Sequence, residues 1–301
     1  MNEQSGSQSG SNVPGVSSAP AMALDLAQVV GQIHALPSLP AVIMELIQSL
    51  GDDDADTHLL AKKIASDQAL VAKMLRVANS SFYGLQGKVT SIQDVVVVLG
   101  LRSVRTLAMA AAVTGSFSGR NAVPGFDFNA FWRHSMGTAL CARALAKRLR
   151  MSEENAFTAA LLHDIGRLVL AACFPAHLTA VLAYRSAHDG LLLDAERAVI
   201  GVDHAQIGEA LTAHWRFPVS IRESVARHHV LDAGEHTPLT GIVHIADGIA
   251  HALELAGDAT CLVPPLSSGV WDTLPLGEDG FLAIFDEVET QFEGACQMLS
   301  A

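Results

Sequence analysis

The pattern of apolar and polar residues along the chain is helical almost throughout. From Ala21 onward, apolar residues recur at the three- and four-residue spacing of helices, and the period-two alternation of strands is not apparent. Short segments rich in glycine, proline or acidic residues separate the periodic stretches, as is typical of the loops between helices. The pattern therefore predicts an all-α fold.

The run Val95–Val98 is the best candidate for a strand. The preceding residues Ser91–Asp94 resemble a helix start, and Gly100 is a typical helix stop. We therefore expect a short buried helix here, with a strand as the alternative.

Breaks in the pattern divide the chain into four parts. The tail is mainly Ser, Gly, Asn, Gln and Pro, which cannot offset chain entropy by burial, so we expect it to be disordered. A Gly- and Pro-containing stretch around Gly119–Gly125 separates two helical halves, and the last part ends in a predicted helix, Phe281–Leu299, that we expect to pack back on the rest. The expected parts are a disordered tail, an amino-terminal helical half, a histidine-bearing half and a carboxy-terminal helical segment, at residues 1–20, 21–119, 120–256 and 257–301.

Composition narrows the classes of function. A chain of 301 residues with 50% hydrophobic content can bury a sizeable core. Its formal net charge of −12 argues against general nucleic-acid binding, because phosphate contacts require a surplus of Lys and Arg. The four cysteines have no CxxC spacing and fit a reducing cytoplasm. The longest apolar runs, such as Leu168–Phe174, are far shorter than the roughly 18 residues of a membrane span, so we expect a cytoplasmic protein without a membrane segment.

The adjacent residues His163 and Asp164 are the centre of the candidate chemistry. They interrupt the segment Ala156–Phe174, which is apolar on nearly every helical face and therefore predicts a buried helix. In one continuous helix, Asp164 would project in the direction of the apolar stripe and would need a partner or a metal. A local salt bridge from Arg167, three residues later, is the simpler alternative.

Other histidines and one aspartate accompany this pair on neighbouring predicted helices. His134 shares the inward face of the predicted helix Phe128–Leu149, and His204 begins another helix. Asp247 lies in line with His244 and His251, although this line could equally be a solvated face. Imidazoles and carboxylates together suit zinc, iron and manganese. The alternative is a buried polar network that only fixes the helix packing, in which every member must be hydrogen-bonded.

The order of these residues resembles a known pattern. His134, then His163-Asp164, then Asp247 resembles the H…HD…D order of the HD phosphohydrolase superfamily, a helical fold that holds divalent metal to cleave phosphate esters. Between about Leu36 and about Leu255, the chain is similar to one branch of it, the HDOD (HD-related output domain) family. The similar segments are Leu36–Pro40, Ser66–Leu70, Asn79–Gly84, Leu99–Arg102, Phe131–Ser135, Leu161–Arg167, Gly201–His204, Trp215 with Pro218, and Arg227–His229.

The resemblance implies an all-helical bacterial signalling module, with an HD-like second half, that is usually a regulatory output without demonstrated catalysis. A signalling protein is the expected partner, and a nucleotide or phosphate is a candidate ligand. The implied ligands of a divalent metal (Fe, Mn or Zn) are His134, His163, Asp164 and Asp247, with His204, His228 and His229 as ligands of a second site.

The alternative that the resemblance leaves open is a metal-dependent phosphohydrolase or phosphodiesterase. In that case metal-bound hydroxide would attack phosphorus, and Arg167 or Lys88 would offset the developing negative charge. The chain has Arg167 where the related cyclic-di-GMP phosphodiesterases resemble one another in having lysine, and no Gly-Tyr-Pro follows His228-His229, which argues against diguanylate cleavage. A further candidate contact for a nucleotide or nucleic acid consists of Lys88, Arg102 and Arg105 near Tyr83.

Overall fold

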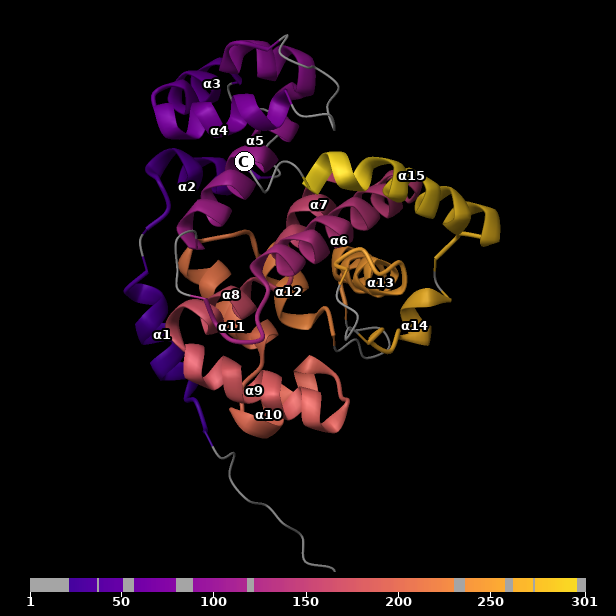
Figure 1. The fold of residues 1–301 in the computed structure, drawn as a ribbon. Coiled ribbons are helices and arrows are strands. Elements are labelled where there is room, and N and C mark those ends of the chain that lie inside the picture. The colour runs from indigo at the N-terminus through magenta and orange to yellow at the C-terminus, as the bar shows by residue number, and fades with distance from the viewer. Residues whose placement is uncertain are drawn as a thin grey trace, which may run out of the picture.

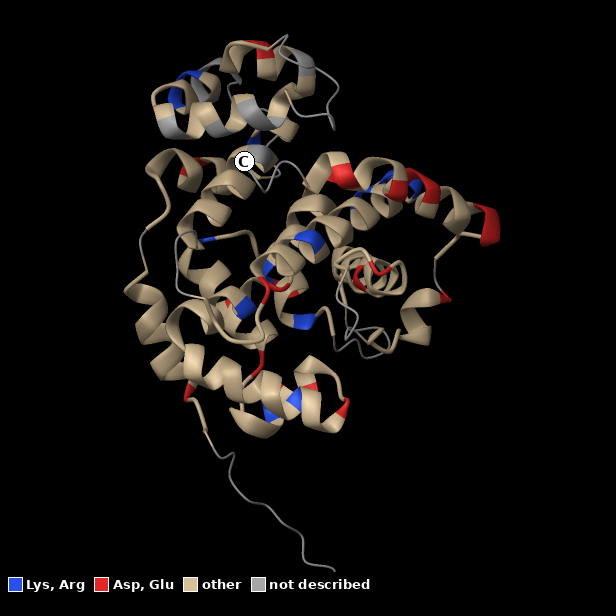
Figure 2. Cartoon of the chain, in the orientation of Figure 1, with Lys and Arg blue, Asp and Glu red and all other residues tan. Residues whose placement is uncertain are grey.

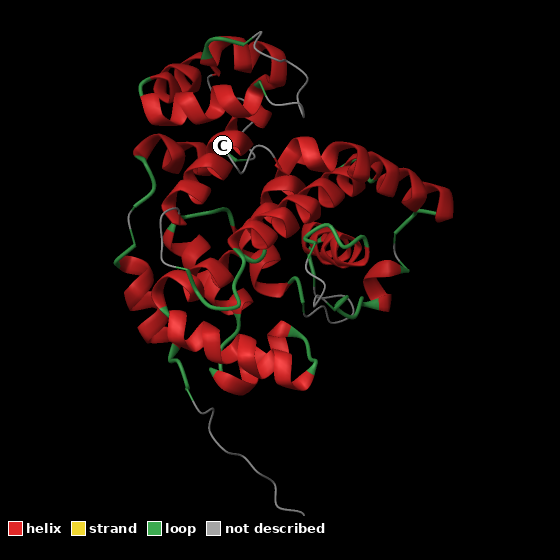
Figure 3. Cartoon of the chain, viewed as in Figure 1, coloured by secondary structure: helices red, strands yellow, loops and turns green. Residues whose placement is uncertain are grey.

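The structure, a computed structural model, describes residues 22–36, 38–50, 57–79, 89–117, 122–229, 236–257, 262–272 and 274–296. Within these ranges the chain forms helices and no strand, as Figures 1 and 3 show, which confirms the predicted all-α fold. The expected tail at residues 1–20 and the residues Tyr83 and Lys88 lie outside the described ranges.

The described residues of the first half form five helices, and the first of them lies apart from the others (Figure 1). These helices are α1 (Leu26–His34), α2 (Ala41–Gln48), α3 (Thr57–Ala65), α4 (Gln68–Ala78) and α5 (Ile92–Phe117). Helices α2–α5 pack together, whereas α1 packs against a helix of the second half. The backbone before α1 is also held there, because Leu24 N–H donates to the Ile200 carbonyl over 2.8 Å. The two halves therefore share contacts at both ends of the first half.

Helix α5 contains the predicted helix start and stop. The Ser91 hydroxyl accepts a hydrogen bond from the Asp94 amide (3.1 Å), and the Asp94 carboxylate accepts one from the Ser91 amide (2.9 Å), which is a capping arrangement. Gly100 has φ 78° and ψ 159°, so it kinks α5 between two helical segments. The predicted helix is confirmed and the strand alternative is wrong. The helix is buried on one side only, because Val95 is buried and Val97 is 84% exposed.

In the second half and the carboxy-terminal segment, the residues that the structure describes form ten helices. They are α6 (Phe128–Arg148), α7 (Glu153–Leu162), α8 (Ile165–Cys173), α9 (Pro175–His188), α10 (Leu192–Val199), α11 (His204–His214), α12 (Val219–Arg227), α13 (Pro238–Ala252), α14 (Ser268–Trp271) and α15 (Glu278–Cys296). Side chains of Asp127, Ser152 and Asp203 accept hydrogen bonds from the first free amides of α6, α7 and α11. These caps fix where the three helices begin.

The expected single helix from Ala156 to Phe174 is wrong, because the chain turns between α7 and α8. His163 ends α7, and Asp164, with φ −96° and ψ 10°, precedes α8 without capping it. The stretch Glu153–Cys173 is long and apolar enough for a membrane span, but 83% of its most apolar window is buried within the protein. Burial of this kind is typical of the core helices of a soluble protein.

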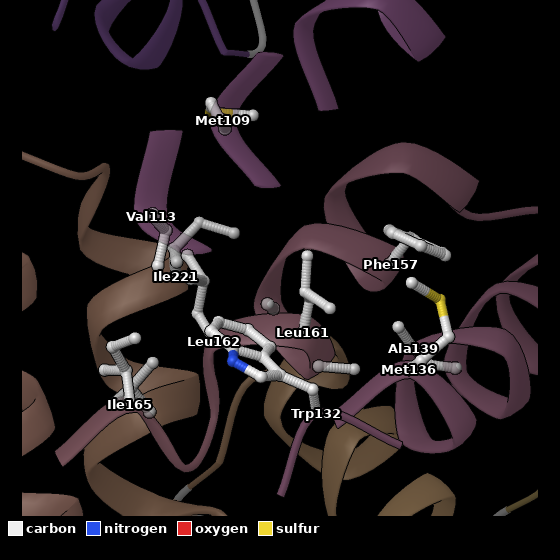
Figure 4. Close-up of a cluster of buried hydrophobic side chains, with 14 of the residues drawn as sticks. Met109, Val113, Trp132, Met136, Ala139, Phe157, Leu161, Leu162, Ile165 and Ile221 are labelled. Carbon is white, nitrogen blue, oxygen red and sulfur yellow. The ribbon is translucent and has the colours of Figure 1, made fainter. Parts of the chain in front are cut away.

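The core is continuous between the two halves. Figure 4 shows Met109 and Val113 of α5 above Leu162 of α7, with Trp132 of α6 and Ile165 of α8 completing the cluster. All five side chains are buried. The turn at His163-Asp164 is therefore held between apolar surfaces on several sides.

The last helix packs along α6, as predicted (Figure 1). It begins at Glu278, three residues before the expected start, and is described as far as Cys296. Its buried side includes Ile284, Val288 and Phe292.

Replacing Gly166 by alanine should destabilise the protein. The added Cβ would lie 2.0 Å from the His204 carbonyl oxygen and 2.8 Å from the Gly208 amide nitrogen, so α8 and α11 would have to move apart. Overpacking of this severity costs about 2 to 4 kcal/mol, which we expect as a fall of about 5 to 10 °C in Tm. The matched control is Gly31→Ala in α1, where the new Cβ meets no atom within 4 Å. Equal melting temperatures for both variants would contradict the close approach of α8 and α11.

Candidate metal centre

The carboxylate of Asp164 is the centre of the candidate site. It is buried at the turn between α7 and α8, with 4% of its surface exposed. Its Oδ2 accepts a hydrogen bond from Arg167 over 2.7 Å, so the predicted local salt bridge exists. Its Oδ1 lies 3.1 Å from His204 Nε2, 3.6 Å from His228 Nε2 and 3.7 Å from His163 Nε2. The salt bridge thus occupies one oxygen and leaves the other facing three imidazoles.

A first group of possible ligands lies between α6, the α7–α8 turn and α13. His134 Nε2 is 3.2 Å from His163 Nε2 and 3.0 Å from Asp247 Oδ1. The side-chain atoms of His134, His163 and Asp164 are close enough to hold one ion, as are those of His134, Asp247 and His251. The structure therefore brings together the four residues predicted for a first metal.

A second group of possible ligands also includes Asp164. His204 begins α11, and His228 and His229 follow α12. His204 Nε2 lies 2.9 Å from His229 Nε2, and the three histidines together with Asp164 could hold one ion. Asp164 thus belongs to both groups, which is the arrangement expected of a residue shared between two metals.

The ring nitrogens that face away from the centre are held by hydrogen bonds. His163 Nδ1 lies 2.6 Å from the Ala160 carbonyl, and His228 Nδ1 lies 2.9 Å from the Val225 carbonyl. A carbonyl oxygen only accepts, so both Nδ1 atoms carry a proton, and Nε2 is the nitrogen that faces the centre and is unprotonated whenever the ring is neutral. Contacts of this kind hold the tautomer and the ring plane of histidines that ligate metals.

His204 is oriented by a carboxylate instead. Glu196 of α10 is fully buried, and its Oε2 accepts hydrogen bonds from His204 Nδ1 (2.6 Å) and from the His204 amide (2.9 Å). Sequence reasoning did not find Glu196, because it lies on an otherwise ordinary amphipathic helix. It also omitted His251 as a ligand, although the four-residue spacing from Asp247 places both on one helical face.

Several buried polar atoms of the cluster lack a hydrogen bond. Among the described residues, His134 Nδ1, His228 Nε2, Glu196 Oε1 and Asp247 Oδ1 have no hydrogen-bond partner. Asp247 Oδ1 nevertheless lies within ion-pair distance of the Nε2 atoms of His134, His163 and His251. Imidazole nitrogens gathered around a carboxylate oxygen are the types of ligand that a divalent cation takes.

The pKa values separate the histidines into two kinds. Burial lowers the pKa of His134 to about 4, and it also lowers the pKa of His228 and His229. Burial acts in the same direction on His204, but the Glu196 and Asp164 carboxylates outweigh it and raise that pKa to about 10. Burial also acts to lower the pKa of His163, but the Asp164 and Asp247 carboxylates outweigh it and raise that pKa. The neutral rings of the first kind are the form in which histidine binds metal.

The two carboxyl groups are ionised. Burial alone would raise the pKa of Asp164, but His163, His204 and Arg167 lower it well below its ordinary value. Burial opposes ionisation of Asp247 as well, and the surrounding histidines, His251 first, hold its pKa well below the ordinary value. Both groups are therefore ready to bind a cation.

Two sequence alternatives for neighbouring residues are wrong. The line His244–Asp247–His251 is not a solvated face, because His244 and Asp247 are buried. His244 is a packing residue, since its Nδ1 lies 2.6 Å from the His228 carbonyl and its Nε2 accepts from the Ser267 amide. Arg105 is no ligand contact, because it is buried and donates to the Ser49 carbonyl.

A cavity of about 1070 Å³ leads to the cluster. Its walls include His134 and His251 from the cluster, together with Arg133, Arg167 and Arg185. The volume is in the range of sites that bind small molecules, and the arginines favour an anion.

An all-helical fold with this buried H…HD…D cluster defines a protein of the HD type. A profile of the HDOD domain family matches residues 36–231, and the chain belongs to the HDOD family. The match ends before α13, so Asp247 and His251 lie beyond it.

Solved structures share the fold. An HDOD domain protein of unknown function from Geobacter sulfurreducens has a TM-score of 0.76 at 22% identity, covering 91% of this chain and 98% of that chain. A protein from Marinobacter aquaeolei VT8, named as a candidate signal transduction protein, has a TM-score of 0.75 at 24% identity, covering 94% and 63%. A candidate phosphohydrolase from Shewanella amazonensis SB2B has a TM-score of 0.67 at 27% identity, covering 91% and 97%.

A curated relative is longer than this chain. It is an uncharacterized protein of Treponema pallidum (strain Nichols), 25% identical over 228 residues, which are 73% of this chain and 43% of the relative. The chain thus spans less than half the length of the curated relative it matches.

The stability of the metal-free protein should fall as the pH rises from 7 to 10. Because the folded-state pKa of His204 is about 10 against an ordinary 6.5, its contribution is complete below 6.5 and is lost as the pH rises through 10. Glu196→Gln removes the carboxylate that raises this pKa, so its Tm should fall less over the same range. Thermal unfolding in chelator measures this, with Glu209→Gln on α11 as the control. A Glu196→Gln profile parallel to that of the control would contradict this role of Glu196.

Proposed function

We propose that this chain is a signal-transduction output module whose histidine pocket binds a divalent metal and which acts through a protein or small-ligand contact rather than through catalysis. The observation that carries the proposal is the set of imidazole Nε2 atoms gathered around Asp164 while their Nδ1 atoms are held elsewhere. Family membership supports the signalling role.

A metal accounts for the cluster better than a packing network does. A packing network is stable when each buried polar atom is hydrogen-bonded, and each atom left without a partner costs about 1 to 3 kcal/mol. The bare Nε2 of His228, 3.6 Å from Asp164 Oδ1, is one such atom. A cation between the lone pairs of the two groups would satisfy both.

The residues fit one or two divalent ions. The first would lie among His134, His163, Asp164 and Asp247, where His134 shares one set of possible ligands with His163 and Asp164 and another with Asp247 and His251. Asp164, His204, His228 and His229 would hold the second. Imidazole and carboxylate ligands suit Fe, Mn and Zn. Such an ion supplies positive charge for binding an anion and, in an enzyme, activates water.

The position of the cluster supports transmission of a signal. Helix α7 packs against α5 of the first half, and α8 packs against α11, which in turn carries α1. A change at the α7–α8 turn therefore has two contact routes to the first half, where a protein partner would respond. Among the described residues, Cys141, Cys173 and Cys296 form no disulfide, which supports a cytoplasmic location. The bacterial sources of the similar structures support a bacterial protein.

A second candidate function is a metal-dependent phosphohydrolase, and the cavity favours it. Arg167 reaches Asp164 and also lines the cavity, so its guanidinium can face both the metal ligands and a bound phosphate ester. The 27% identity with the candidate phosphohydrolase from Shewanella amazonensis supports this reading.

Protein purified without added metal should contain at least one equivalent of Fe, Mn or Zn by elemental analysis. Asp164→Asn removes the ligand shared by both groups and should abolish the metal, whereas His204→Ala should remove the second ion only. Removal of the metal by chelator should lower Tm through linkage. His188→Ala replaces an exposed histidine outside the cluster and should leave the metal content unchanged. No metal in the wild type, even after refolding with each ion, would refute the proposal.

The two candidate functions differ in turnover of phosphate esters. The signalling proposal predicts no hydrolysis of bis(p-nitrophenyl) phosphate or cyclic nucleotides by metal-loaded protein. The hydrolase alternative predicts turnover that falls by about 10²- to 10³-fold in Arg167→Gln with the metal content retained, because the positive charge that stabilises the negatively charged transition state is lost. Turnover that persists in Asp164→Asn would belong to a contaminant and would count for neither.

A further inference from the structure

A row of polar contacts joins α15 to α6. Figure 2 shows acidic residues along α15 beside basic residues of α6. Arg148 donates to Glu287 over 3.1 Å, Lys147 lies 3.6 Å from the same carboxylate, and Arg143 donates to Gln291. These contacts lie on the same helix as His134 but toward its carboxy-terminal end.

Arg133 makes the contact nearest to the histidine cluster. Its guanidinium donates to both oxygens of Glu293, over 3.2 and 2.7 Å, and lies 4.7 Å from the centre of the Phe292 ring. The residue directly precedes His134 in the sequence, and it also lines the cavity that leads to the cluster. Arg133 therefore contacts α15 through its guanidinium and also borders the cavity.

The cavity concentrates positive charge near this contact. Arg133 of α6, Arg167 of α8 and Arg185 of α9 come from three helices and line the same space. Asp127 and Asp189 are the acidic residues among the lining residues. Guanidinium groups bind phosphate through paired, charge-assisted hydrogen bonds, so a phosphate group is the anion that this wall suits.

The bond that holds Arg133 at α15 is one that a ligand can replace. The side chain of Glu293 is 73% exposed, whereas that of Arg133 is 26% exposed. Exposed ion pairs contribute little to stability because water and salt screen them. A phosphate in the cavity, partly shielded from water, would compete well for the same guanidinium.

We propose that Arg133 is the gating residue of an anion subsite in this cavity, which binds the phosphate group of a small ligand when Glu293 releases it. Binding exchanges the Arg133–Glu293 pair for an Arg133–phosphate pair and loosens the last turns of α15. The inference rests on the proposed signalling function, to which it adds a ligand and names α15 as the element that responds to it. It does not depend on a bound metal.

Titration calorimetry of the full chain with inorganic phosphate and with AMP tests the subsite. Glu293→Gln frees Arg133 and should tighten binding about two- to five-fold, which corresponds to the loss of a competing exposed ion pair. Arg133→Gln should weaken binding about ten-fold or more, because a charge-assisted pair is lost. Tighter binding of AMP than of phosphate would identify a phosphate ester as the ligand, and equal affinities would identify free phosphate.

The matched control is Glu287→Gln. It removes another carboxylate between α15 and α6, which contacts Arg148 and Lys147 and does not line the cavity. Its affinity should equal that of the wild type. Identical effects of Glu287→Gln and Glu293→Gln, or no binding of either probe to the wild type, would overturn the proposal.

Hydrogen exchange supplies a second measurement. If the Arg133–Glu293 salt bridge were only structural, phosphate would not change the amide exchange rates of α15. Amides in the last turns of α15 should exchange faster when phosphate is added to the wild type, and phosphate should not change them in Arg133→Gln. Faster exchange without ligand in Glu293→Gln is expected for the same reason. The calorimetry and the exchange measurements are made on the full chain after chelator has removed any metal. A negative result in them therefore does not bear on the metal content, and a negative elemental analysis does not bear on phosphate binding.

Discussion

The carboxylate of Asp164 lies inside an apolar helical bundle, and its charge determines how the surrounding residues are arranged. An ionised group in this environment needs compensation that water would otherwise give. Arg167 satisfies one oxygen, and imidazoles from three further elements of the chain face the other. The negative charge of Asp164 can be compensated in two ways, by protons on His163 and His204 or by a bound cation. Metal binding would replace the first state by the second and would release protons.

The backbone around Asp164 places its carboxylate where other side chains can compensate the buried charge. A continuous helix through Ala156–Phe174 would direct the carboxylate along one apolar stripe, whereas the turn between α7 and α8 places it within reach of histidines of α6 and α11 and of the residue that follows α12. Asp164 stands where an aspartate would ordinarily cap α8, yet it makes no cap. Gly166 then allows α8 to approach the backbone of α11, which brings His204 to the site. A residue with a side chain at position 166 would separate the two groups of ligands.

The sequence predicts the fold class, and it names most of the residues that the structure brings together at the candidate site, because both depend on local patterns. Helical periodicity, the cap at Ser91 and the stop at Gly100 are short-range signals, and the H…HD…D order can be read without knowing the packing. What requires the structure depends on tertiary contacts. The turn at His163-Asp164 contains no glycine or proline that would predict it. The contact of Glu196 with His204 depends on how α10 and α11 pack. The burial of Asp247 depends on the helices that pack on both sides of α13. Whether Arg133 faces solvent or α15 is likewise decided by a helix more than 140 residues away in sequence.

The central claim is that the cluster is a metal centre, and the most direct measurement is anomalous diffraction from crystals of the protein loaded with manganese or iron. The account predicts an anomalous peak between His134 Nε2, His163 Nε2 and Asp164, with ligand distances of about 2.0 to 2.2 Å and with the Nδ1 contacts to Ala160 and Glu196 unchanged. A second peak beside His204 and His228 would complete the two-ion arrangement. Peaks confined to surface residues, with the buried histidines and carboxylates hydrogen-bonded to one another or to water, would contradict it.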